Sequence, residues 1–268
     1  MSLWCTQVQP AKSQGGDGQS NDGGSFEVYS SSLILCTGSS PSAFTIDLPD
    51  FRYHKLDLDI ALSPSCLGST LPQDAATTVG VIGSSHSAVT VLMNLYRLAS
   101  TSHPHLQVKW FSRRPLIYAV YMDGWILHDN TGLKGVSATF ARENLEDDRL
   151  SCSPVGKFIE KVDCSDDRED DMYQTNLPKC THIVQAVGFI RDPLPPLTRD
   201  GAALEEVTYD HQKGGFADTQ GRKITGLYGA GIAFPELVTD PAGNTEFAVG
   251  FWKFMKYLKN VVPHWTIG

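Results

Sequence analysis

Short apolar runs and one amphipathic period alternate through the middle of the chain. The runs lie at residues 33–36, 79–82, 106–111 and 181–187, and their length and composition are typical of buried strands. After the second run, Ala88, Val91, Leu92 and Leu95 recur at three- and four-residue spacing, which predicts the buried face of a helix. A strand, a helix and a strand in this order predict a β-α-β unit that begins at residue 79.

Weaker patterns flank this unit. Residues 4–8 and 26–29 suit the two arms of a hairpin, joined by the glycine- and serine-rich stretch 12–25, which is expected to be a loop. Residues 46–78 contain three prolines and little periodicity, so an irregular crossing between domains is expected. Residues 118–149 predict no element, and the acidic run 163–171 is expected to be a solvated loop rather than a calcium site.

An aromatic stripe near the end of the chain predicts the last helix. Asn244 is the expected N-cap and Pro263 is expected to stop the helix. The stripe is expected to be core rather than a cofactor contact, and its members are Phe247, Phe251, Phe254 and Leu258.

Composition bounds the class of protein. The chain has 268 residues, of which 41% are hydrophobic, so it can bury a sizeable core in one or two domains. Its formal net charge of -8 and its pI of about 5.4 argue against nucleic acid or an acidic membrane surface as the main partner. No apolar run approaches the roughly 18 residues that a membrane-spanning helix needs.

The cysteines and the first residues favour the cytoplasm. The six cysteines are dispersed, without a Cys-x-x-Cys pair or the spacing of metal ligands, so reduced and mostly buried thiols and no metal site are expected. The first residues lack a basic segment followed by an apolar stretch, so no secretory signal is predicted. Reduced thiols without a signal are typical of a cytoplasmic protein.

Candidate chemistry begins where the second apolar run ends. The pattern Gly83-x-Ser85-x-x-Ala88 is close to a dinucleotide-binding turn, in which a glycine bends the chain and the N–H groups of a helix start face a pyrophosphate. Ser85 replaces the second glycine of that pattern, so its side chain either weakens binding or donates its hydroxyl to a phosphate. The candidate cofactor-binding residues of this turn are Gly83, Ser84, Ser85, His86, Ser87 and Ala88.

Two other interpretations of the turn stay open. A serine hydrolase would place Ser85 in a Gly-x-Ser-x-Gly elbow, but Ser87 stands where the second glycine is needed. The helix is alternatively a packing element with no ligand at its start, and His86 is then simply an exposed residue.

Arg113 and Arg114 follow the next predicted strand and bear on the choice of nucleotide. A carboxylate at this position accepts hydrogen bonds from the ribose hydroxyls of NAD, whereas arginine accommodates the 2′-phosphate of NADP. The segment after the strand contains no acid, so the sequence favours NADPH over NADH.

Four turns in order resemble a known superfamily. The first run ends in Thr37-Gly38, the Gly83 turn follows, and then come Ala186-Val187-Gly188-Phe189 and the stretch from Gly226 to Gly231. In this order they resemble the flavin-containing monooxygenase and pyridine-nucleotide oxidoreductase superfamily. The resemblance implies that a set of residues lies near FAD, although Ile232 stands where the superfamily has an acid; the set is Thr37, Gly38, Gly188, Gly231 and Ile232.

The resemblance also implies the domain organisation. We expect an α/β fold in which a Rossmann-like NAD(P)-binding domain, residues 79–190, is inserted in a partial FAD-binding domain. That partial domain would comprise residues 1–78, with a linker, and residues 191–268.

One part of the superfamily pattern is not found. No glycine turn with a strand ahead and a helix behind precedes Gly38, so the first FAD-binding turn is missing. The chain is expected to correspond to the C-terminal half to two-thirds of a member: a natural short form, a chain that needs a partner, or a truncated gene model. We therefore expect little or no FAD binding by the chain alone. We also expect self-association, or a partner chain that supplies the missing half, because exposed strand edges invite pairing.

The predicted function is that of an NADPH-linked, flavin-dependent oxidoreductase or monooxygenase acting on a small organic metabolite. The sequence identifies no catalytic residue. The alternative is a non-catalytic NADP-binding or scaffold protein that has lost its flavin site.

Overall fold

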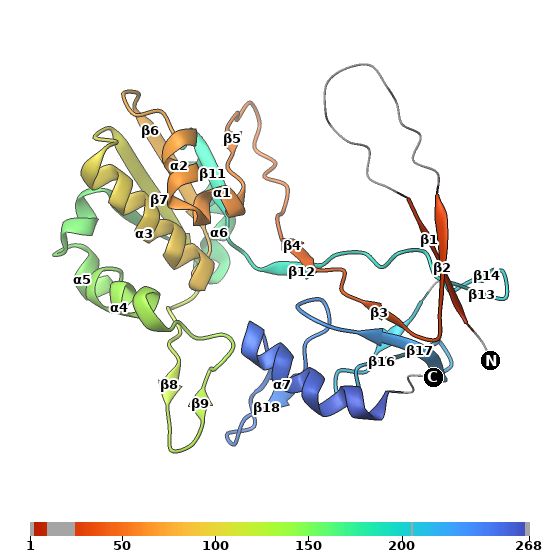
Figure 1. Cartoon of the computed structure of the whole chain (residues 1–268). Coiled ribbons are helices and arrows are strands. Elements are labelled where there is room, and N and C mark those ends of the chain that lie inside the picture. The colour runs from red at the N-terminus through yellow and green to blue at the C-terminus, as the bar shows by residue number, and fades with distance from the viewer. Residues whose placement is uncertain (1–2, 10–24, 205, 266–268) are drawn as a thin grey trace. The chain divides into compact units, whose positions relative to one another are not determined.

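The computed structural model describes residues 3–9, 25–204 and 206–265, and the chain forms two compact units (Figure 1). The large unit comprises Ser40–Ile190 and Thr239–Glu246, and the small unit comprises Met1–Ser39, Arg191–Val238 and Phe247–Gly268. The large unit is therefore inserted within the small one along the chain. Where the chain passes between them, strands β4 (Ser39–Pro41) and β12 (Phe189–Arg191) pair in a two-stranded sheet.

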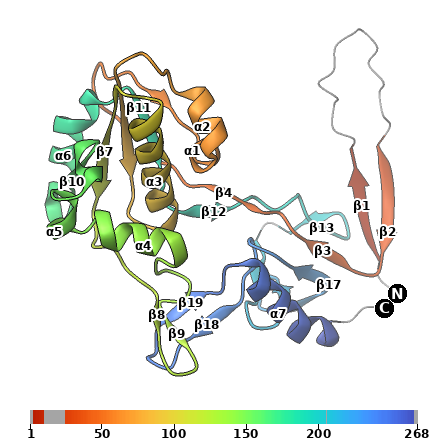
Figure 2. The ribbon, with the colours of Figure 1, turned by 60° about the vertical axis from the view of Figure 1, so that its left-hand side comes forward.

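A five-stranded parallel sheet forms the centre of the large unit (Figure 2). Its strands lie in the order β10-β7-β6-β11-β5, and every neighbouring pair is parallel. Helix α3 (His86–Thr101) connects β6 to its neighbour β7, which confirms the predicted β-α-β unit. The chain thus adds strands to one side of β6 and then to the other, as in doubly wound nucleotide-binding folds. The strands are β5 (His54–Lys55), β6 (Thr77–Ile82), β7 (Leu106–Ser112), β10 (Ile159–Asp163) and β11 (His182–Gln185).

Both faces of this sheet are covered because successive strand side chains point to opposite sides. Val81 packs in the core on one face, while its neighbour Ile82 packs in the core on the other. The first face is covered by α3 and four further helices, and the second by α6 (Glu169–Asn176) (Figure 2). The four further helices are α1 (Leu58–Leu62), α2 (Pro64–Thr70), α4 (Gly135–Asn144) and α5 (Asp147–Leu150).

Three segments differ from the sequence-based expectation. Residues 46–78 are not an irregular crossing: they carry β5, α1 and α2, whose apolar residues Leu58, Ala61 and Leu67 lie in the core of the large unit. Residues 118–149, for which no element was predicted, contain α4, α5 and the hairpin of β8 (Val120–Tyr121) and β9 (Ile126–Leu127). The acidic run 163–171 is not simply a loop, because a 3-10 turn over Asp166–Arg168 leads directly into α6.

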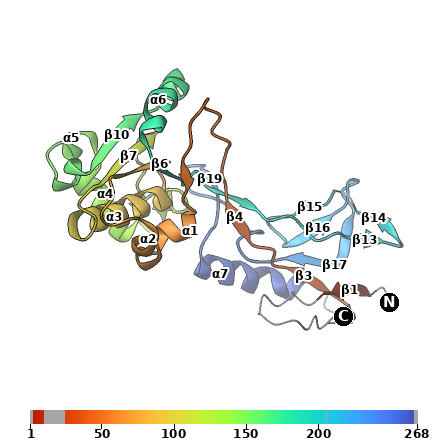
Figure 3. The same ribbon diagram turned by 90° about the horizontal axis from the view of Figure 1, so that it is seen from above.

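The small unit is built on a mixed four-stranded sheet, β15-β16-β17-β3 (Figure 3). β3 is parallel to β17, while β16 is antiparallel to both β15 and β17. Tyr209, Phe216 and Phe234 form most of its aromatic core. The strands are β3 (Leu33–Leu35), β15 (Thr208–Tyr209), β16 (Gly215–Ala217) and β17 (Lys223–Gly229).

Three short hairpins complete the described strands. The predicted pairing of β1 (Trp4–Val8) with β2 (Phe26–Ser30) is confirmed, while the loop predicted between them lies almost entirely outside the described residues. The other two hairpins are β13 (Thr198–Arg199) with β14 (Ala202–Ala203), and β18 (Leu237–Thr239) with β19 (Thr245–Phe247).

The last helix, α7 (Phe251–Val261), begins later than predicted. Asn244 is not its N-cap; its side chain donates to Asp240 in the turn between β18 and β19, and Gly250 caps the helix instead. The predicted stripe is only partly right: Leu258 packs against the buried cluster of Tyr228, Tyr257 and Val261, and Phe254 is half-buried. Phe247 and Phe251 are exposed. The helix ends at Val261, close to the predicted stop.

The cysteines are more exposed than expected. All six are free thiols, but only Cys164 and Cys180 are buried. Burial raises the pKa of both buried thiols to about 11, so they stay protonated at neutral pH. Within the described residues, no helix is long and apolar enough to cross a membrane, and no three potential metal-ligating side chains gather.

Candidate functional site

The structure brings the Gly83 turn and Arg113 to one edge of the large unit's sheet. Gly83 follows β6 and Arg113 follows β7, and these strands are parallel neighbours with Ile82 opposite Phe111. The Gly83 N–H donates to the Phe111 carbonyl at 3.0 Å, which fixes the two strand ends together. Carboxyl ends of parallel strands are where doubly wound folds bind nucleotides.

Gly83 is held in a backbone conformation that a side chain would disrupt. Its φ is +132°, and a Cβ atom would lie 2.3 Å from the carbonyl oxygen of Ala186 at the end of β11. The indole N–H of Trp110 also donates to the Gly83 carbonyl at 2.7 Å. Gly83 therefore allows the ends of β6 and β11 to approach, at the point where the strand order reverses.

The first turn of α3 lies just beyond Gly83. Ser85 is the N-cap in an extended conformation, and its hydroxyl forms no capping hydrogen bond. Ser85 and His86 are exposed, Ser84 and Ser87 are half-buried, and Ala88 is buried beneath the turn. The first N–H groups of a helix have no acceptor within the helix, so this arrangement suits an anion such as a pyrophosphate.

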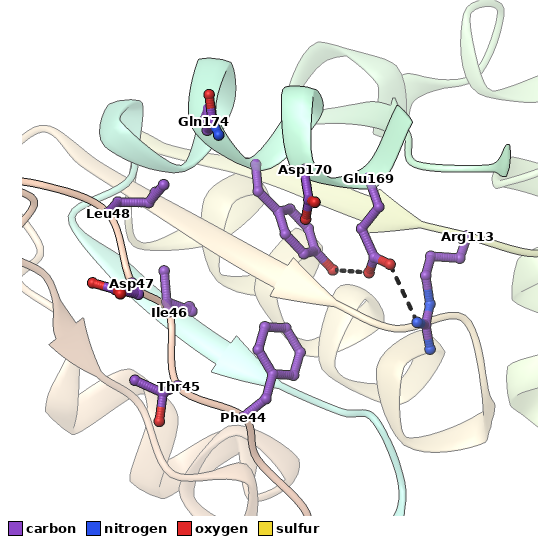
Figure 4. Close-up of a pocket in the computed structure, with 10 residues that line it drawn as sticks. Phe44, Thr45, Ile46, Asp47, Leu48, Arg113, Glu169, Asp170 and Gln174 are labelled. Atoms are coloured by element: carbon purple, nitrogen blue, oxygen red, sulfur yellow. Dashed lines mark hydrogen bonds and ion pairs between the residues drawn. The ribbon is translucent and has the colours of Figure 1, made fainter. Parts of the chain in front are cut away.

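The two arginines after β7 differ in their contacts. Arg113 Nη1 lies 3.3 Å from Glu169 Oε2, and the other carboxylate oxygen accepts a 2.8 Å hydrogen bond from the Tyr173 hydroxyl (Figure 4). Arg114 is exposed, and its carbonyl accepts from the Ser112 hydroxyl at 2.9 Å. No ion pair of Arg114 is formed within the part of the chain that the structure describes.

A pocket of about 410 Å³ opens beside this ion pair, between residues 44–48 and α6 (Figure 4). Arg113 and Glu169 line one end, and the rings of Phe44 and Tyr173 stack with their centroids 6.0 Å apart. Burial, reinforced by the hydrogen bond to Glu169, raises the pKa of the Tyr173 hydroxyl above its usual value. The hydroxyl thus remains a donor that holds the carboxylate in place.

Sequence reasoning missed Glu169, Tyr173 and Phe44. The contact between Arg113 and Glu169 spans 56 positions, and the acidic run gave no sign that Glu169 starts a helix at the sheet edge. The short turn over Asp166–Arg168 is what directs Glu169 back toward the sheet.

Four of the five residues expected near FAD lie in the small unit. β3 and β17 are parallel, and the Ala230 N–H donates to the Leu35 carbonyl at 2.9 Å, so Thr37, Gly38, Gly231 and Ile232 leave one edge of the sheet. The Thr37 hydroxyl is buried and has no hydrogen-bond partner within the described residues. An unpaired buried hydroxyl costs free energy, so this edge fits a polar ligand.

The remaining features of this edge are mixed. Gly38 and Gly231 both have positive φ, 82° and 81°, as tight turns require. Ile232 is exposed and offers no charge or hydrogen-bonding side chain. Gly188, the fifth residue, belongs to the large unit and has a φ of 115°.

Comparison with known proteins supports the resemblance of the turns. The chain is 59% identical over 239 residues to monooxygenase AgnR1 of Paecilomyces divaricatus. The match covers 89% of this chain and 61% of that relative, so the chain spans about three-fifths of the relative's length. No protein-family model matches the chain.

Solved structures give only partial matches. An FAD-dependent pyridine nucleotide-disulphide oxidoreductase from Desulfovibrio vulgaris matches with a TM-score of 0.41 and 11% identity, over 89% of this chain and 54% of that one. The reduced CoADR-RHD of Bacillus anthracis matches with a TM-score of 0.44 and 14% identity, over 91% of this chain and 40% of that one.

The chain is thus an α/β protein with a parallel nucleotide-binding type of sheet. In the order of its turns and in its identity to AgnR1, the chain is similar to the superfamily of flavin-containing monooxygenases and pyridine-nucleotide oxidoreductases.

Proposed function

We propose that the chain is the NADPH-binding part of a flavin-dependent monooxygenase or related oxidoreductase that acts on a small organic metabolite. The observation that carries this proposal is the joint position of the Gly83 turn and Arg113 at the carboxyl edge of β6 and β7. The name of the relative at 59% identity supports the monooxygenase class.

Each part of the edge has a separate task in this proposal. The N–H groups at the start of α3 bind the pyrophosphate, and Gly83 allows the backbone to approach it closely. Arg113 and Arg114 bind the 2′-phosphate, because guanidinium groups form strong charge-assisted hydrogen bonds with phosphate oxygens. The nicotinamide and the flavin supply the hydride-transfer chemistry when bound.

The flavin contacts are proposed at the edge of the small unit. The Thr37 hydroxyl would donate to the cofactor, and Gly38 and Gly231 would let the backbone approach it. The side chain of Ile232 cannot accept a hydrogen bond, so we propose that this chain alone holds FAD weakly.

A binding titration tests the nucleotide assignment. Changing Arg113 and Arg114 together to alanine should weaken NADPH binding by about 1–3 kcal/mol more than NADH binding, the range for lost hydrogen bonds to charged groups. Arg149→Ala is the matched control, because Arg149 is an exposed arginine whose partner is Asp148. An equal loss of affinity for both nucleotides in the double variant would contradict the assignment.

The exposed Ile232 also favours a second candidate, a nucleotide-binding protein without flavin chemistry. The visible absorbance of the purified chain separates the two. A bound flavin gives a yellow protein, whereas a colourless protein that remains colourless after dialysis against FAD supports the second candidate.

A further inference from the structure

Glu169 brings a carboxylate to a position where the sequence after β7 has none. The first turn of α6 reaches the carboxyl edge of the sheet, and Glu169 Oε2 lies 3.3 Å from Arg113 Nη1 (Figure 4). In doubly wound folds, a carboxylate at this edge accepts hydrogen bonds from the ribose hydroxyls of NAD. The fold therefore presents an arginine and an acid together, although they are far apart in the sequence.

The carboxylate is fixed rather than free to turn away. The Tyr173 hydroxyl donates to its other oxygen at 2.8 Å, and only 29% of the Glu169 side chain is exposed, against 58% of Arg113. Held in this way, Glu169 offsets part of the positive charge that Arg113 presents to an incoming phosphate.

We propose that Glu169 sets the nucleotide preference of this site, an inference that rests on the proposed binding of a pyridine nucleotide here. Its carboxylate repels the doubly charged 2′-phosphate of NADPH and competes with it for Arg113. The same carboxylate accepts a hydrogen bond from the ribose hydroxyls of NADH. The site therefore takes both nucleotides, and its preference for NADPH is smaller than two arginines alone would give.

Dissociation constants of NADPH and NADH, measured by fluorescence titration of the full chain, test this inference. Glu169→Gln keeps the shape of the side chain and removes its charge. It should tighten NADPH binding by about two- to tenfold, the effect expected for one partly exposed charge, and weaken NADH binding. Tyr173→Phe should change the ratio of the two constants in the same direction by a smaller factor, because the carboxylate is then less well fixed.

Asp170→Asn is the matched control. Asp170 lines the same pocket on the same helix, and the substitution removes the same charge without removing the partner of Arg113. It should leave the ratio of the two dissociation constants nearly unchanged. Urea unfolding of each variant checks that the fold is retained.

The outcomes separate this inference from the proposed function. If Glu169→Gln weakens NADPH binding, then Glu169 orients Arg113 for the phosphate and the inference is overturned. It is also overturned if the ratio follows that of Asp170→Asn, while the proposed function survives as long as the double arginine variant still loses NADPH selectively. If the unmodified chain binds neither nucleotide, both fail.

Discussion

The two units bury their sheets in different ways. In the large unit, helices cover both faces of a parallel sheet, and side chains of the sheet such as Val81 and Ile82 pack beneath them. The small unit packs a mixed sheet on an aromatic core, while α7 presents Phe251 and Trp252 to solvent. Parallel sheets are stable only when both faces are covered, so the large unit has the cover its architecture requires. The comparison shows that the parallel sheet is enclosed on both faces, whereas the small unit leaves apolar side chains of α7 exposed.

The largest expected effect on stability is at Gly83 in the large unit, which lies against the carbonyl of Ala186. Gly83→Ala places a methyl group 2.3 Å from the Ala186 carbonyl at a φ of +132°. The combined strain and overpacking should lower the free energy of unfolding by about 2–5 kcal/mol and abolish nucleotide binding. Urea unfolding, with hydrogen exchange of peptides from β6 and β7, measures the loss.

Gly188→Ala provides the control for that substitution. Gly188 also has a positive φ, 115°, but a Cβ atom there would meet nothing within 4 Å. The control should therefore show the backbone strain without the clash. Equal losses for the two variants would mean that the contact with Ala186 is unimportant.

A smaller loss is expected in the small unit from Tyr209→Phe. The Tyr209 hydroxyl lies 3.2 Å from the carbonyl oxygens of Gly229 and Phe234, and also 3.2 Å from the Tyr257 hydroxyl. Removing it leaves buried polar groups unpaired, which should cost about 1–3 kcal/mol. In this variant, protection from hydrogen exchange should be lost in β15, β16 and β17 and kept in β6 and β7.

The same hydroxyl predicts a difference at alkaline pH. Burial, with the hydrogen bond to Tyr257, raises the pKa of Tyr209 above its ordinary value of 10.0. Above pH 10 the Tyr209 hydroxyl loses its proton in the unfolded chain before it does so in the folded chain. The contribution of this hydroxyl to stability is therefore full below pH 10 and declines above it. The stability difference between the unmodified chain and Tyr209→Phe should therefore shrink as the pH rises past 10.

The smallest effect on folding is expected at Trp252, which is 81% exposed on α7. We propose that the chain self-associates through the apolar surface that Phe251 and Trp252 form on α7. Contiguous exposed apolar side chains mark interaction sites. Trp252→Gln should change the free energy of unfolding by less than about 0.5 kcal/mol, as is usual for surface substitutions. It should nevertheless lower the average mass seen by sedimentation velocity at high protein concentration.

Lys256→Gln, on the same helix and also exposed, is the control for that variant. An unmodified chain that sediments as a monomer at every concentration would exclude self-association. An unchanged mass distribution in Trp252→Gln would place the contact elsewhere.

The sequence predicts the elements whose signal is local. β6, α3 and β7 were predicted because an unbroken apolar strand and a long helical period are each visible within one window. α1 and α2 were missed because neither is long enough to show a period, and their apolar residues are buried only by contact with the rest of the large unit. The predicted start of α7 was wrong because the Asn244 side chain donates a hydrogen bond to Asp240 within a turn. No rule of residue spacing reveals this contact.

The candidate site shows the same division. The Gly83 turn and Arg113 could be predicted because each follows a strand directly. Glu169 could not be predicted, because only the register of β7 with β10 and the path into α6 bring it to Arg113. The sequence therefore identified the positive part of the edge and missed the carboxylate beside it.

The parallel pairing of β3 with β17 has a consequence for the order of events during synthesis. Leu33 lies opposite Leu227, and the whole large unit except its short return segment separates them along the chain. A ribosome therefore releases β3 long before its partner exists, and closing so long a loop is slow. All five strands of the large sheet lie between β3 and β17 in the sequence, so they are synthesised before β17 is available to pair with β3. Domains tend to fold as units while the chain is being made, which gives the inserted unit the first opportunity to fold and leaves the enclosing one to close last.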